Sequence, residues 1–189
     1  PMTARTAKPG TPTDFAPKGA VTGIGSLPFR DSYDSVEFVE RWSPAVPFWP
    51  QLPARNSLDS IAAQALGDFG DPGFLKGLDR VFEPREGGGF DVAGRHLRGV
   101  MRKFDEGPAQ FEADGMAGWR VFLDRAAEGA FDHALALKGQ IVGPWSLASL
   151  LHTGGQPFAA AARLLEATAR HVGRHAANQA RRLGRLGRP

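Results

Sequence analysis

Two short apolar runs, each ending in a turn rich in glycine and proline, constrain this chain most strongly. The first is Thr22–Pro28 (TGIGSLP) and the second is Leu137–Pro144 (LKGQIVGP). Such runs are typical of buried strands in α/β proteins, and the turns that follow them expose backbone N–H groups to small molecules. The two motifs therefore predict strands with a ligand site at their ends.

Strands and helices alternate along the rest of the sequence. Buried strands are predicted over 19–28, 46–53 and 134–142, where apolar runs are bounded by Gly and Pro. Helices are predicted from Asp31 or Ser32 to Trp42, from Asn56 or Ser57 to Leu66, over 111–128, over 145–152 and from Pro157 onward. This order predicts an α/β fold of parallel βα units with both sheet faces covered. In the first of these helices Val36, Val39 and Trp42 are spaced to face the core. The apolar stripe of the last helix is predicted to be Phe158, Ala162, Leu165, Ala169, Val172, Ala176, Ala180 and Leu183.

Two stretches of the chain do not fit this alternation. Residues 67–99 are irregular, and a β-hairpin insertion is predicted there from two short runs, 80–84 and 90–93. Residues 1–18 are rich in Pro, Thr, Ala and Lys without an apolar signal-peptide core, which predicts a disordered lead-in. The folded part is expected to span 19–189.

Charge is unevenly distributed. The formal net charge is +3, but residues 157–189 hold seven arginines and a single acid, Glu166. A basic end can attract nucleic acid. However, no aromatic side chains lie between these arginines as in single-strand binders, so a solvated helix face is favoured and no nucleic-acid partner is expected.

Composition excludes several further classes. The sequence has no cysteine, which rules out disulfides, thiolate metal sites and cysteine nucleophiles in this chain. No apolar run approaches the roughly 18 residues of a membrane helix, so no membrane partner is expected. These features favour a cytoplasmic location.

Four segments, taken in order, carry a resemblance to a known family. They are Thr22–Pro28, Phe48–Asn56 (FWPQLPARN), Leu137–Pro144 and Asn178–Pro189 (NQARRLGRLGRP). Together they resemble the catalytic barrel of cobalamin-independent methionine synthase, and more closely its short single-barrel homologues; the uroporphyrinogen decarboxylase family shares the superfamily fold. The likeness extends over residues 19–189, with Val142 where the family commonly has Thr.

The resemblance implies a partial (β/α)8 TIM barrel, comprising the first three or so βα units with a small β-hairpin insertion. Complete members transfer a methyl group from a folate or a corrinoid to a thiol that zinc activates as thiolate. The family's zinc ligands, one His, two Cys and a Glu, lie in later strands. The resemblance therefore implies that this chain binds no metal and is inactive alone, and activity would require strands from a longer gene product or a second chain.

Substrate-binding residues are implied by the first two segments. Ile24, Gly25 and Ser26 match the turn that holds the amino-acid end of the thiol substrate, although the glycines could simply permit a tight turn. Gln51 falls near the position of a Glu that binds the substrate ammonium; a neutral amide cannot supply that charge. Phe29 stands where homologues often have His or Gln.

Cofactor-binding residues are suggested by the third segment. Lys138 and Gln140 should point to one face of their strand because side chains alternate, and a lysine there needs an anionic partner, either a ligand or a structural acid. Trp145 and Trp49 follow strands and could stack on a flat cofactor, although core packing is more common at such positions.

Two further interpretations complete the sequence-based picture. His171 and His175 have the i, i+4 spacing that suits a metal, but they are flanked by Arg170 and Arg174 without an acid, so no metal role is expected. The main alternative function is a non-enzymatic module that binds a small molecule or a protein. Because a three-stranded parallel sheet leaves an open edge, a homo-oligomer or a complementing chain is expected.

Overall fold

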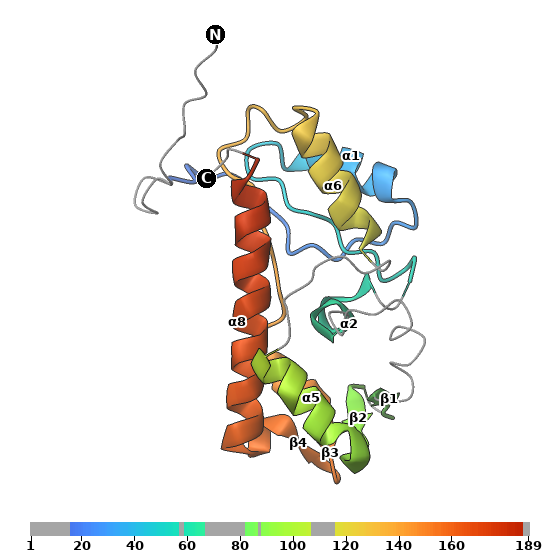
Figure 1. Ribbon diagram of the computed structural model, residues 1–189. Helices are drawn as coiled ribbons and strands as arrows, with labels where there is room; N and C mark the ends of the chain where they lie inside the picture. Colours follow the sequence, from blue (N-terminus) through green and yellow to red (C-terminus); the bar gives the residue numbers. More distant parts are fainter. Residues whose placement is uncertain (1–15, 57–58, 67–81, 87, 107–115, 187–189) are drawn as a thin grey trace.

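One long helix, α8 (Ala162–Gly184), runs along almost the whole molecule (Figure 1). The computed structural model describes residues 16–56, 59–66, 82–86, 88–106 and 116–186. Helices α1 (Ser32–Trp42) and α6 (Ala117–Ala127) lie near one end of α8, and α5 (Gly94–Glu106) lies with a small sheet near the other. The fold is mixed α/β, as the alternation of the sequence predicts.

The three predicted strands are extended segments that run parallel in the predicted direction. The bridge Ser26↔Gln51 joins the first to the second, and the bridge Phe48↔Lys138 joins the second to the third. Only isolated bridges form, so the pairing is shorter than expected for full strands. Prolines at 47, 50 and 53 explain this, because each removes a backbone donor from the middle segment.

Helix α1 confirms the predicted boundaries. The carboxylate of Asp31 accepts hydrogen bonds from the backbone N–H groups of Tyr33 and Asp34, at 2.7 and 3.0 Å, and so caps the helix. Val36 and Val39 are buried as expected. Trp42, which was expected in the core, is 60% exposed, and the guanidinium of Arg41 lies over its ring.

The predicted hairpin forms and is part of a larger sheet. Strand β1 (Phe82–Pro84) pairs antiparallel with β2 (Phe90–Val92). Strand β2 pairs in parallel with β3 (Leu151–Thr153), which turns into β4 (Gln156–Pro157). The sequence-based helix boundaries were wrong here: α7 (Pro144–Leu150) ends before His152, and α8 begins after Pro157. Residues 151–153 form a strand instead of helix because they pair with β2, which lies far away in the sequence, and residues 156–157 then pair with β3.

Two other helices differ from expectation. Helix α5 was missed, although Leu97, Val100, Met101 and Phe104 have helical spacing and pack into one core. Helix α2 (Ile61–Leu66) begins later than predicted, and residues 57–58 lie outside the described part. Residues 111–115 of the predicted 111–128 helix, and most of the predicted lead-in over 1–18, also lie outside it.

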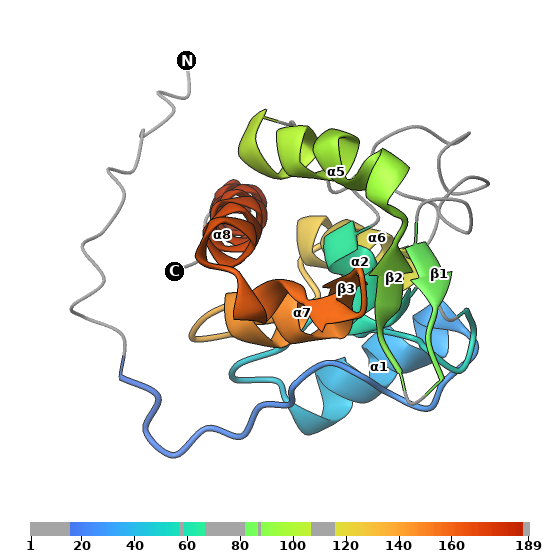
Figure 2. The ribbon, with the colours of Figure 1, turned by 90° about the horizontal axis from the view of Figure 1, so that it is seen from below.

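Two hydrophobic clusters fill the molecule, and α8 contributes to both. The cluster at the sheet end includes Phe104, Leu151 and Phe158, together with Val172 of α8. The cluster at the other end includes Val36, Trp49, Trp119, Phe122 and Leu137, together with Leu183 of α8. Seen along its axis in Figure 2, α8 stands beside α7 and α5, and these are the helices it contacts most.

The buried face of α8 is rotated from the apolar stripe that the sequence suggests. Of that stripe, Ala162, Ala176 and Ala180 are exposed. The buried residues instead include polar ones and are Ala167, Thr168, His171, Val172, His175, Gln179 and Leu183. A hydrophobicity pattern assigns polar side chains to the solvent-facing side of a helix. Here, polar side chains of α8 make hydrogen bonds to neighbouring segments instead, and these hydrogen bonds determine which face of the helix is buried.

We predict that Gly118→Ala destabilises the protein by about 1–3 kcal/mol, the usual cost of overpacking. A methyl group at Gly118, in the first turn of α6, would overlap the carbonyl oxygen of Pro50. The matched control is Gly99→Ala in α5, where a methyl group meets nothing within 4 Å. That control should raise stability by about 0.5–1 kcal/mol. Urea denaturation measures both; equal effects of the two variants would contradict this account of the α6 contact.

Candidate functional site

The predicted substrate-binding turn lies where the first two extended segments pair. Leu27 N–H donates to the Gln51 carbonyl at 2.9 Å, and Gln51 N–H donates to the Gly25 carbonyl at 2.7 Å. Gly25 adopts φ +127°, which disfavours any residue with a side chain, and the Gln140 amide occupies the space a side chain would need. The backbone of the turn is therefore fixed by pairing and packing.

Side chains of the turn differ in accessibility. Ile24 is 79% exposed and Ser26 is exposed as well. The Ser26 hydroxyl reaches Gln51 Oε1 only at 3.5 Å, a long hydrogen bond. The Ser26 hydroxyl is therefore accessible from solvent.

Gln51 has a different environment from the other predicted residues. It is 1% exposed, and its amide donates to Gln64 Oε1 of α2 at 2.7 Å. Gln64 in turn donates to the Asp59 carbonyl at 3.2 Å. Burial raises the pKa of the Asp59 carboxyl, although the nearby Arg55 guanidinium acts in the opposite direction. The Gln51 side chain is thus engaged in a buried polar network that fixes the second segment to α2.

Lys138 lies on the side of its segment opposite α8. A side chain at the neighbouring Gly139 would meet Gln179 of α8, and alternation places Lys138 on the other side. We call this side, with Gly23, Phe48, Lys138 and Gln140, the inner face. The Lys138 ammonium donates to the Gly23 carbonyl at 2.7 Å and lies 5.9 Å from the centroid of the Phe48 ring. The third segment thereby contacts the first across the second.

The charge of Lys138 is not neutralised by a carboxylate within the described part of the chain. Burial lowers the pKa of its ammonium below the ordinary value. Beside it, the Gln140 amide N–H donates to the Trp49 carbonyl at 2.5 Å, and Gln140 Oε1 is buried without a hydrogen-bond partner. An anion on the inner face would satisfy the ammonium.

The two tryptophans suggested for cofactor stacking lie apart. Trp49 is fully buried; it packs edge-on against Trp119, and its indole N–H donates to Gln179 Oε1 at 3.2 Å. Trp145, in the first turn of α7, is 63% exposed. The structure therefore brings together Ser26, Gln51, Lys138 and Gln140, while Trp49 belongs to the core and Trp145 to the surface.

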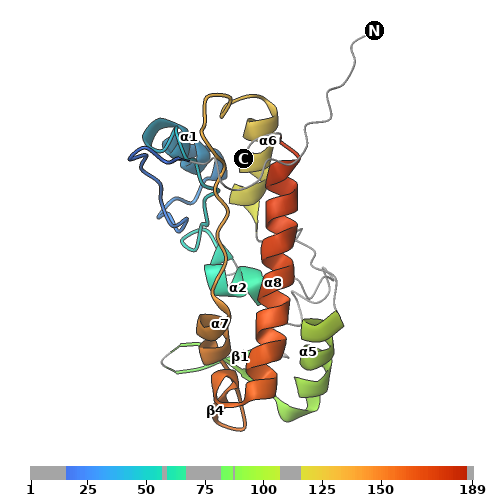
Figure 3. The same ribbon diagram turned by 90° about the vertical axis from the view of Figure 1, so that its left-hand side faces the viewer.

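A groove that the sequence did not indicate lies between the third segment and α8. It encloses about 560 Å³ and is lined by residues 137–141 on one side and by Ala176, Gln179, Ala180, Leu183 and Gly184 on the other. Figure 3 shows the extended segment running beside α8. Small residues at 176, 180 and 184, spaced by one helical turn, were the available signal for this groove.

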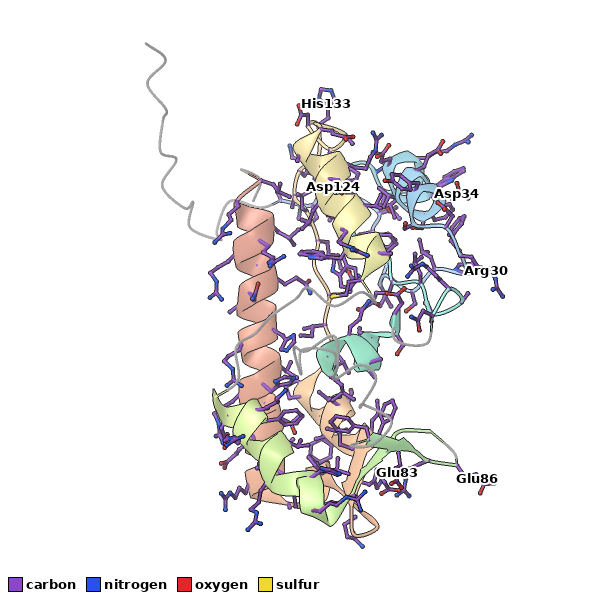
Figure 4. All side chains as sticks on the ribbon, turned by 45° about the vertical axis from the view of Figure 1, so that its right-hand side comes forward. Arg30, Asp34, Glu83, Glu86, Asp124 and His133 are labelled. Atoms are coloured by element: carbon purple, nitrogen blue, oxygen red, sulfur yellow. The ribbon has the colours of Figure 1, made fainter. Side chains whose placement is uncertain are left out.

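A second hollow, of about 660 Å³, lies between α1 and α6 and is lined mainly by acids. Arg125, one of the lining residues, pairs with Glu40 at 2.9 Å and with Glu128 at 3.1 Å. Asp34 and Asp124 project from the same end of the molecule in Figure 4. The Arg125–Glu40 ion pair joins α6 to α1 across this hollow, so we interpret it as a contact between the two helices.

The histidine pair of α8 is part of the core. The His171 ring stacks on Phe104 with centroids 4.4 Å apart, its Nε2 lies 2.6 Å from the Ala65 carbonyl oxygen, and His175 contacts it edge-on. Burial, with the neighbouring His175 and Arg174 as smaller causes, lowers the pKa of His171 to about 3. Among the described residues, no group of three or more His, Cys, Asp or Glu could hold a metal ion.

Two arginines of the basic helix join α8 to α5. The Arg174 guanidinium donates to the carbonyls of Lys103, Phe104 and Asp105, in the last turn of α5, and these hydrogen bonds are partly buried. The Arg170 guanidinium pairs with the Asp105 carboxylate at 2.7 Å. These arginines therefore cap the C-terminus of a neighbouring helix, whereas Arg163, Arg181 and Arg185 are exposed.

We predict that acidification destabilises the protein through His171. The unfolded chain binds a proton near pH 6.5 and the folded chain only near pH 3, so stability falls as pH drops through this window. The slope contributed by His171 is about 1.4 kcal/mol per pH unit. Denaturant midpoints measured between pH 7 and pH 4 test this.

His171→Phe should flatten that pH dependence, because the variant removes the titrating group. His133→Gln is the control, since His133 projects into solvent after α6 (Figure 4). A pH slope that is identical in the wild type and in His171→Phe would contradict the assignment.

We also predict that Arg174→Met lowers stability by about 1.5–3 kcal/mol, because charged hydrogen bonds to buried acceptors are lost. Arg181→Met, at an exposed position of the same helix, should change stability by no more than about 0.5 kcal/mol. Thermal unfolding measures the difference; similar melting temperatures for the two variants would argue against the capping role.

Comparison with protein-family models, with curated proteins and with solved structures finds no match to this chain. Within the described ranges, no helix is both long and apolar enough to span a membrane. The geometry of the inner face and the groove is therefore the basis on which function is inferred.

Proposed function

We propose that the three parallel segments are the first βα units of a (β/α)8 barrel of the type found in cobalamin-independent methionine synthase. In this proposal their carboxyl ends hold the small thiol or amino-acid substrate of a methyl-transfer reaction. The chain supplies part of the substrate site and becomes active only when further strands complete the barrel.

The contact between Lys138 and Gly23 carries this proposal. Neighbouring strands are separated by about 4.8 Å, so the first and third are about twice as far apart in a flat sheet. The Lys138 ammonium nevertheless reaches the Gly23 carbonyl across Phe48. A side chain spans two strands in this way when the sheet curls toward it, as a barrel sheet does.

The residues of the inner face carry groups that can pair with an amino acid. The Lys138 ammonium can pair with a ligand carboxylate, and the accessible Ser26 hydroxyl can donate to it or accept from an ammonium. The Gly25 carbonyl is already used by the Gln51 backbone and is not available. Binding and orientation are thus the contributions of this chain.

The zinc ion that the resemblance implies does not fit these residues. The sequence has no cysteine to act as a thiolate ligand, and the described ranges contain no cluster of three metal-binding side chains. No step of the proposed function is therefore assigned to a metal held by this chain.

We predict that calorimetry detects binding of homocysteine, methionine, a methyl-folate or a methyl-corrinoid to the full chain. Lys138→Met and Ser26→Ala should weaken the amino-acid ligands by about tenfold or more, because each removes a hydrogen bond to a charged group. Lys138→Arg keeps the charge and should retain much of the affinity. Ser146→Ala, at an exposed position of α7, is the control and should bind as the wild type does.

A second candidate function, a non-enzymatic protein-binding module, is favoured by one observation. Val21 and Ile24, in the first segment, are 71% and 79% exposed, and exposed apolar side chains of this size suit a protein contact. Binding of none of the four ligands, or equal affinity in the wild type and Lys138→Met, would overturn the first proposal and favour this one.

A further inference from the structure

Helix α5 has a positively charged outer face. Arg95, Arg98 and Arg102 are spaced by three and four residues, so they lie on one side of the helix, and all three are exposed. The apolar side chains of α5 lie on the opposite side and pack into the hydrophobic cluster at the sheet end. Figure 2 shows α5 at the edge of the molecule, with the other helices and the sheet on one side of it. The three arginines, which we call the arginine row, therefore face outward.

The arginine row has no ionic partner within the described ranges. None of its guanidinium groups pairs with a carboxylate there, in contrast to Arg170 of α8, which pairs with Asp105. The nearest polar contact is between neighbours in the sequence, where Arg95 Nε donates to the His96 ring at 3.0 Å. Residues 94–104 contain no Asp or Glu. The positive charge of this face is therefore not compensated by the helix that carries it.

The arginine row does not help α5 to form. Arg95 is in the first turn, where the helix dipole favours acidic side chains and none is present. Arg98 lies three residues from Arg95 and four from Arg102, and like charges at these spacings repel each other. Gly99, on the same face, lowers the helix propensity, although a side chain there would meet nothing within 4 Å. Residues that oppose the stability of their own helix without a packing reason indicate a binding surface.

The chemistry of the row indicates a phosphate ligand with more than one phosphate group. A guanidinium group donates two parallel hydrogen bonds to a phosphate and keeps its charge at any physiological pH. The row extends over about 10 Å of the helix axis, which is longer than a single phosphate group and suits successive phosphates of a polymer. Because Gly99 has no side chain, a phosphodiester backbone can approach the helix between the arginines.

The other residues of α5 favour a duplex over other phosphate-bearing surfaces. A helix that binds a membrane surface inserts apolar side chains, whereas those of α5 are packed in the core. A single-strand site uses exposed aromatic rings for base stacking, and Phe104 of α5 is buried against His171. The phosphate backbone of a duplex needs only an exposed row of positive charges.

We propose that the outer face of α5 binds double-stranded nucleic acid through its phosphates, without reading the bases. Arg95, Arg98 and Arg102 pair with backbone phosphates, and Gly99 leaves room for them. These residues lie outside 157–189, on whose charge the sequence-based expectation of no nucleic-acid partner rests. None of them belongs to the inner face, so this proposal does not depend on the methyl-transfer function.

The test measures binding of the full chain to a short fluorescent DNA duplex by anisotropy over a range of salt concentrations. The logarithm of the affinity should fall linearly with the logarithm of the salt concentration, by about 0.9 for each phosphate contact. Arg98→Gln should reduce this slope by about 0.9 and lower the affinity at low salt by about tenfold. Arg181→Gln removes the same charge from an exposed position near the C-terminal end of α8 and should leave the slope unchanged.

A second pair of substitutions tests the space at Gly99. Gly99→Glu places a carboxylate in the row and should weaken binding by about tenfold or more, while its melting temperature should not fall because glycine is the poorer helix former. Gly184→Glu makes the same change at the last residue of α8, where a side chain also meets nothing within 4 Å, and should bind as the wild type does. Equal salt slopes in the wild type and in Arg98→Gln, or no binding of the duplex at low salt, would overturn the proposal.

Two other results would overturn it in favour of a different ligand. Binding to vesicles that contain anionic lipid, without binding to the duplex, would identify a membrane surface as the partner. Tighter binding of a single-stranded oligonucleotide than of the duplex would indicate base stacking by residues outside α5. Duplex binding without binding of any thiol or methyl donor would leave this proposal standing and remove the substrate assignment.

Discussion

The hydrogen bonds of the Gln179 side chain fix α8 against the second and third extended segments. Gln179 Oε1 accepts from the Trp49 indole at 3.2 Å, and its amide donates to the Gln140 carbonyl at 3.0 Å. One buried side chain of α8 thereby joins the second and third extended segments to the helix. Both segments have few backbone bonds to each other, so this cross-link substitutes for a long ladder. The position of α8, and with it the groove, depends on this contact.

Fixing α8 has consequences at both ends of the molecule. Toward its N-terminus, Arg170 and Arg174 bind the C-terminus of α5, and His171 stacks on Phe104. Toward its C-terminus, Leu183 joins the cluster around Trp49 and Trp119. A single helix thus connects two cores that would otherwise be separate. Buried polar groups on such a helix lower stability unless they are satisfied, which makes the helix orientation specific.

Local patterns predicted the elements that depend on few distant contacts. Helix α1 was predicted within a residue because Asp31 caps it locally, and the hairpin of β1 and β2 was predicted from two short runs around glycines. Predictions failed where distant residues compete. Leu151–Thr153 pairs with β2, so a helix predicted through His152 ends early. The α8 stripe was misplaced because Gln179 and His171 are buried by partners that the sequence does not reveal.

The sequence by itself determined that three apolar, proline-bounded segments alternate with helices and that a glycine turn follows the first, because these features follow from backbone sterics and hydrophobic spacing. Only the tertiary structure decided which of the candidate side chains are engaged within the protein and which are left at its surface. It engaged Gln51 with Gln64, buried Trp49 against Trp119, and left the Lys138 ammonium on the inner face beside Gly23. The reason is that burial and hydrogen-bond partners are set by segments far apart in the chain, and spacing within one segment carries no information about them.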